Sequence, residues 1–109
     1  MAYDELLAKR INGLIKGKKG FTCKEMFGGI AYLLNGNMCV GVHKGDLIIR
    51  YDPKMTEEIN TDKNVLPFDI TGRPMKGWSL VGSEGIKGDQ LGKWFDLSFN
   101  FAKKLPPKK

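Results

Sequence analysis

The chain has 109 residues, of which 41% are hydrophobic and 28% are charged, a composition typical of one folded domain and unlike that of a disordered segment. It contains no apolar run near the roughly 20 residues that a membrane-spanning helix needs, and no apolar signal core at its start. We therefore expect one cytoplasmic domain over 1–109, ordered over about 3–105, with a basic tail at 106–109 and no membrane association.

The net charge of +6 is concentrated in the two ends of the chain. Residues 1–20 carry a net charge of +3, residues 21–75 a net charge of −1, and residues 76–109 a net charge of +4. Basic ends can contact nucleic-acid phosphates, but no zinc finger and no basic stretch interleaved with aromatic residues accompanies them. Direct nucleic-acid binding through the basic ends is therefore kept as the alternative function.

Helices are predicted at both ends of the chain. Asp4 can cap a helix that runs to about Lys16, and Asp89 can cap a second helix that runs to about Leu105. The second helix is apolar over about two-thirds of its circumference, which is typical of a helix buried on two sides. It either fills a groove between a sheet and the first helix or gives part of its aromatic face to a subunit interface, and on this basis we predict a homodimer.

An antiparallel hairpin is predicted around Asn35-Gly36, because both residues tolerate the positive φ of a type I′ turn. This turn sets a register with three pairs: Leu33 with Met38, Tyr32 with Cys39, and Ala31 with Val40. A second turn at Lys44-Gly45 adds the pairs Val42 with Leu47, Val40 with Ile49, and Cys39 with Arg50. One face then carries Ala31, Leu33, Met38, Val40, Val42, Leu47 and Ile49. The other face is also too apolar for water, so something must cover it.

Further strands are expected around Phe68–Ile70 and at 78–81, with a short helix or turn over 52–60 between the meander and them. Gly28 and Gly29, at the entry to the first hairpin strand, indicate a bulge or a close backbone approach. The predicted fold class is α+β: an antiparallel meander of about four to five strands, flanked by an N-terminal and a C-terminal helix.

Catalytic and metal-binding motifs were not found in the sequence. His43 is the one histidine, and neither a G-x-S-x-G elbow nor a phosphate-binding loop occurs. Cys23 and Cys39 are expected to be reduced, buried thiols, because with His43 they lack the spacing of a metal site. We predict a non-enzyme without cofactor or metal.

Two regions stand out as candidates for binding. The stretch 71–78 combines two cations and an aromatic residue beside a tight turn, which suits an anion or a peptide carboxylate but also a purely structural turn. Arg50 lies on an apolar sheet face and needs a partner, either an internal carboxylate or a group on another chain. The candidate interaction surface consists of Arg50, Arg73, Lys76, Trp78, Tyr32, Phe95 and Phe99.

The segments MAYDELLAKRI, KEMFGGIAYLLNGNMCVGV, DLIIR, DITGRPMKGW and FAKKLPP occur in this order over about residues 3–107. In them the chain resembles the TfoX N-terminal domain family of bacterial competence regulators. The resemblance implies an antiparallel sheet flanked by terminal helices. The full-length regulators promote transcription of DNA-uptake genes with a cyclic-AMP-responsive activator, and they have a second, helix-hairpin-helix-like domain that 1–109 does not include. The expected function is a non-catalytic protein-interaction module linked to transcription, with a protein partner in the transcription machinery.

Overall fold

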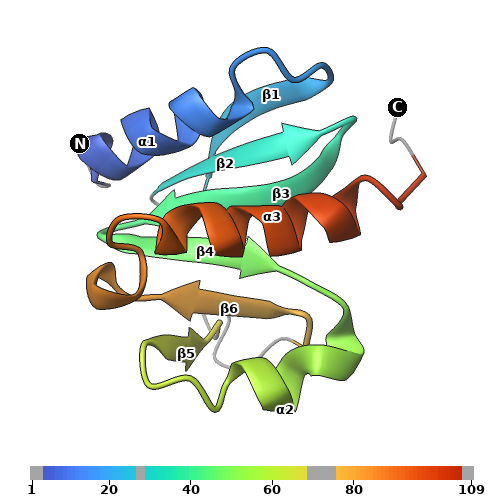
Figure 1. Ribbon diagram of the computed structural model, residues 1–109. Helices are drawn as coiled ribbons and strands as arrows, with labels where there is room; N and C mark the ends of the chain where they lie inside the picture. Colours follow the sequence, from blue (N-terminus) through green and yellow to red (C-terminus); the bar gives the residue numbers. More distant parts are fainter. Residues whose placement is uncertain (1–3, 27–28, 69–75, 107–109) are drawn as a thin grey trace.

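The computed structural model describes residues 4–26, 29–68 and 76–106 as three α-helices, two short 3₁₀ helices and a six-stranded sheet. The elements are α1 (Glu5–Ile15), β1 (Phe21–Met26), β2 (Gly29–Leu34), β3 (Asn37–His43), β4 (Asp46–Arg50), η1 (Pro53–Met55), α2 (Thr56–Ile59), β5 (Val65–Pro67), β6 (Trp78–Val81), η2 (Ser83–Gly85) and α3 (Gln90–Ala102). The strand order is β1-β2-β3-β4-β6-β5, with every pair antiparallel. Figure 1 shows α1 and α3 on one face of this sheet. The predicted α+β class is confirmed.

The terminal helices form where the sequence predicts them. The carboxylate of Asp4 caps α1 by accepting hydrogen bonds from the backbone N–H groups of Leu6 (2.9 Å) and Leu7 (3.2 Å). α3 begins after Asp89 as predicted, but the Asp89 side chain makes no capping hydrogen bond, and the helix ends at Ala102, three residues before the predicted Leu105. Within the described part of the chain, no helix is long and apolar enough to cross a membrane.

β1 is a strand that the sequence did not predict. Four of its six residues, 22–25, are exposed, so the strand carries no alternation of buried and exposed side chains that could reveal it. Cys23 lies in this exposed part, and the prediction that it is buried is therefore wrong.

The predicted register between β2 and β3 is correct next to the turn and wrong further along the two strands. Asn35 and Gly36 adopt φ values of 52° and 86°, and Leu33 pairs with Met38 as predicted. The register then shifts by one residue, so that Tyr32 pairs with Val40 instead of Cys39. A shift of one residue moves side chains to the opposite face.

Tyr32 gives the physical reason for this bulge. The extra residue of the bulge is Cys39 on β3, so Tyr32 pairs with Val40. The Tyr32 hydroxyl donates a hydrogen bond to the carbonyl oxygen of Ala8 in α1 (3.2 Å). Ala31 consequently pairs with Gly41 instead of Val40, and the face predicted for Ala31 and Leu33 is wrong. Between β3 and β4, Val42 pairs with Leu47 and Val40 with Ile49 as predicted, whereas the predicted pair of Cys39 with Arg50 does not form.

The main core lies between the sheet and the two long helices. It contains side chains from α1, α3 and the central strands, among them Ile11, Tyr32, Val40, Val42, Leu47, Ile49 and Phe95. A smaller cluster of Ile48, Phe68 and Leu80 is buried on the opposite face, with Met38 and Trp78 packed against it. Both sheet faces are therefore apolar, as predicted. Phe68 directly follows β5, whereas Ile70 lies outside the described residues.

Candidate functional site

Two members of the predicted interaction surface lie in the core. Tyr32 is 1% exposed and Phe95 is 2% exposed. The ring of Phe95 belongs to a cluster of three mutually packed rings, with centroids 6.1 Å apart for Phe95 and Phe21, 5.9 Å for Phe95 and Phe99, and 6.0 Å for Phe21 and Phe99. Phe99, which also belongs to the predicted surface, is half-buried. Tyr32 and Phe95 therefore stabilise the fold and are not accessible to a partner.

Arg50 and Trp78 are brought together, as neighbours on β4 and β6. The guanidinium carbon of Arg50 lies 4.9 Å from the Trp78 ring centroid and 5.6 Å from that of Phe101, and Nη1 donates to the carbonyl oxygen of Met38 (3.2 Å). Partial burial lowers the pKa of Arg50 below its usual value. Among the described residues the one ion pair is that of Lys87 with Glu84, so the partners found for Arg50 are aromatic rings and a carbonyl.

The remaining predicted residues do not join this pair into one surface. Lys76 is exposed in the turn before β6, and Arg73 lies outside the described residues. Cys39 is buried, and this burial raises the pKa of its thiol to about 12, so the thiol stays protonated at neutral pH. Within the described segments, no group of three His, Cys, Asp or Glu side chains could hold a metal ion.

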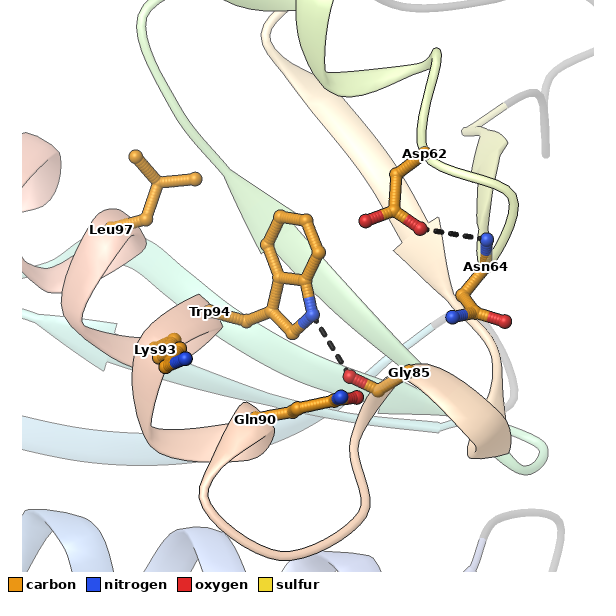
Figure 2. A pocket seen from close by; sticks show the side chains of 7 residues that line it. All are labelled: Asp62, Asn64, Gly85, Gln90, Lys93, Trp94 and Leu97. Carbon is orange, nitrogen blue, oxygen red and sulfur yellow. Dashed lines mark hydrogen bonds between the residues drawn. The ribbon is translucent and has the colours of Figure 1, made fainter.

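The structure shows a site that the sequence did not reveal, which we call the α3 groove. It consists of two cavities that share Leu97 on α3. The first has a volume of about 350 Å³ and is lined by Asp62, Asn64, Gly85, Gln90, Lys93, Trp94 and Leu97 (Figure 2). The second, of about 260 Å³, is lined by Asp52, Met55, Leu97, Asn100, Phe101 and Lys104.

The first cavity is fixed by hydrogen bonds on both sides. The indole Nε1–H of Trp94 donates to the carbonyl oxygen of Gly85 (2.9 Å), which ties α3 to η2. On the opposite wall, the carboxylate of Asp62 accepts from the backbone N–H of Asn64 (2.8 Å), as Figure 2 shows. A side chain at Gly85 would collide with Val81, because an added Cβ would lie 2.7 Å from Val81 Cγ1. The wall next to Trp94 is therefore a close-packed surface.

The two walls of the groove differ in charge. The α3 side carries Lys93 near one end and Lys104 near the other, whereas the opposite side carries Asp62 and Asp52 at the corresponding ends. Asp52 is held at the start of η1, where its carboxylate accepts from the backbone N–H of Lys54 (3.0 Å). The groove is lined by two carboxylates, two lysines, amides and apolar side chains, a mixture that is suited to binding the side chains of a partner.

Both basic ends of the chain meet at Phe99. The Nζ atom of Lys18 lies 5.8 Å from the Phe99 ring centroid, and that of Lys103 lies 5.5 Å from it. Lys18 also donates to the carbonyl oxygen of Leu14 (2.9 Å) near the end of α1. Residues more than eighty positions apart thus form one local concentration of positive charge.

The comparisons with known proteins gave one finding. No curated protein and no solved structure matched the chain. The model of the TfoX N-terminal domain family matches residues 14–102, a range from the end of α1 to the end of α3. This match covers most of the chain, and the protein therefore belongs to the TfoX N-terminal domain family.

Proposed function

We propose that this chain is a non-catalytic protein-interaction module that acts in the regulation of transcription in the bacterial cytoplasm, and that the α3 groove is its contact surface. The link to transcription rests on membership of the TfoX N-terminal domain family and on what the resemblance to competence regulators implies. The location of the contact surface rests on the geometry of α3.

One observation carries the proposal: Trp94, Leu97 and Phe101 of α3 are only half-buried and line the groove. Apolar side chains at the centre of a surface, with charged groups around them, are typical of protein interfaces, and tryptophan is enriched among the residues that dominate binding energy. Trp94 is held in place by its bond to Gly85, so little conformational entropy would be lost when a partner binds.

Filling the second cavity tests this function. Asn100 is exposed and lines that cavity, so Asn100→Trp should block the groove without removing a buried side chain. In the native cell, we expect Asn100→Trp to reproduce most of the transcript changes caused by deleting the gene, as measured by RNA sequencing. Asn12→Trp, an exposed asparagine of α1, is the matched control and should behave like the wild type.

The comparison requires that Asn100→Trp and Asn12→Trp have the same cellular protein levels and the same thermal unfolding midpoints. The proposal is contradicted if deletion of the gene leaves transcript levels unchanged. It is equally contradicted if Asn100→Trp behaves like the wild type while the deletion does not, since the groove is then not the contact surface.

The convergence of Lys18 and Lys103 on Phe99 supports a second candidate function, direct nucleic-acid binding. Duplex DNA binding should then weaken by orders of magnitude between about 50 and 200 mM salt in fluorescence anisotropy. Replacing both lysines by alanine should reduce the salt slope by about 2, because each phosphate contact contributes about 0.9. Replacing the exposed Lys54 and Lys63 by alanine removes the same charge elsewhere on the chain and serves as the control. An equal loss of DNA affinity in both double variants would contradict this candidate function.

A further inference from the structure

We propose that the α3 groove is occupied by a second copy of this chain, related to the first by a two-fold axis that runs along the groove. This inference rests on the proposed function and names the partner of the same site. It is argued from the placement of four charged side chains and from the apolar residues between them.

The charges of the groove come in two opposed sets. The first cavity has Lys93 on the α3 side and Asp62 on the other, and the second has Lys104 on the α3 side and Asp52 on the other. All four are exposed, and within the described residues none of them forms an ion pair. Each end of the groove therefore offers one positive and one negative group to an occupant.

A two-fold axis along the groove makes this arrangement self-complementary. The rotation exchanges the two walls but leaves each end of the groove in place, so α3 of the second copy lies over the aspartate wall of the first. The partner's Lys93 then meets Asp62, and the partner's Lys104 meets Asp52. Because such an interface uses the same patch on both copies, each contact occurs twice. An axis across the groove would instead place aspartates over aspartates, which like-charge repulsion disfavours.

The apolar residues fit the same arrangement. Leu97 belongs to both cavities and so lies midway along the groove, with Trp94 and Phe101 on either side of it on α3. A specific interface covers about 800 Å² on each partner, which is about an eighth of the 6777 Å² of accessible surface of this chain. The 13-residue helix α3 gives the patch a length of about 20 Å. Along this length the four charges form the rim of an apolar centre, as in specific interfaces.

Charge reversal on the lysine wall of the groove is the first arm of the test. By sedimentation equilibrium or light scattering at micromolar concentration, the full chain should show twice its mass of 12.2 kDa. Lys93→Glu with Lys104→Glu should raise the dimer dissociation constant about 100-fold or more, because four opposite-charge contacts become like-charge contacts. Lys9→Glu with Lys24→Glu changes the net charge equally on exposed residues outside the α3 groove, and this control should remain dimeric.

A charge swap is the second arm. Asp52→Lys with Asp62→Lys should also be monomeric, but an equimolar mixture of this variant with the Lys93→Glu, Lys104→Glu variant should form a heterodimer, since every contact then joins a lysine to an acid. The aspartate variant loses two hydrogen bonds from backbone N–H groups. If this variant does not fold, the comparison of the lysine variant with its control decides whether the second copy occupies the groove.

A wild-type chain that is monomeric at 100 µM overturns this inference. A control variant that dissociates as readily as the Lys93→Glu, Lys104→Glu variant also overturns it. So does an equimolar mixture of the two folded charge-swap variants that stays monomeric. These outcomes are distinct from failure of the proposed function. A monomer whose Asn100→Trp variant still alters transcript levels contradicts only the second copy, and a dimer without any effect on transcripts contradicts only the role in transcription. Occupation of the groove by another protein in a monomeric chain would likewise replace the second copy as the partner.

Discussion

Replacing Gly29 by alanine is expected to lower the free energy of unfolding by about 3 kcal/mol or more, a cost at the upper end of the range for overpacked sites. An added Cβ would collide with the carbonyl oxygen of Val42 and would lie 2.9 Å from its carbonyl carbon and 3.2 Å from Cα of His43. These are backbone atoms of the adjacent strand and cannot rotate away. Gly29 also pairs with Met26 on the other side, so β2 has no room to shift.

Urea denaturation followed by circular dichroism measures this effect. Gly13→Ala is the matched control, because a Cβ at this position in α1 meets no atom within 4 Å. Alanine there should raise the free energy of unfolding by about 0.5–1 kcal/mol, through the higher helix propensity of alanine. A Gly29→Ala variant that unfolds at the same urea concentration as the wild type would show that β2 and β3 are not held this closely.

Gly29 also illustrates which features of the fold can be predicted from the sequence and which cannot. Gly28 and Gly29 indicated a bulge or a close backbone approach; Gly28 lies outside the described residues, and at Gly29 the close approach is confirmed, to atoms of Val42 on another strand. The cap at Asp4 and the turn at Asn35-Gly36 were predictable, because both depend on residues a few positions apart. The bulge after the hairpin was not predictable, because it depends on where the hydroxyl of Tyr32 reaches α1.

The candidate site was harder to predict for the same physical reason. The spacing of Trp94, Leu97 and Phe101 along a helix is that of a core stripe, and nothing local tells these residues from Phe95. Phe95 is buried because Phe21, from a strand without any alternation signal, packs on it. The opposite wall of the groove comes from segments thirty or more positions away. The sequence therefore predicted the apolar character of this helix, whereas one stripe of it is buried and the prediction did not tell which part of its surface stays open.

Phe95→Ala is expected to destabilise the chain by about 3–5 kcal/mol, the usual cost of truncating a buried phenylalanine. Since whole domains have only about 5–15 kcal/mol of stability, this variant should be close to unfolding at 37 °C. Phe99→Ala, one turn further along α3 and half-buried, is the comparison. It should cost clearly less, because its ring is already partly in contact with water.

The unfolding midpoints of both variants should be measured at two protein concentrations. A side chain that serves the fold lowers the midpoint equally at both, whereas one that serves a subunit interface changes the concentration dependence itself. We expect the first result for Phe95, because its ring is buried and packs against the rings of Phe21 and Phe99 of the same chain. If the unfolding midpoint of Phe95→Ala equals that of the wild type at the lower protein concentration, Phe95 belongs to the interaction surface after all. This outcome would also mean that β1 does not cover α3 as it does in this structure.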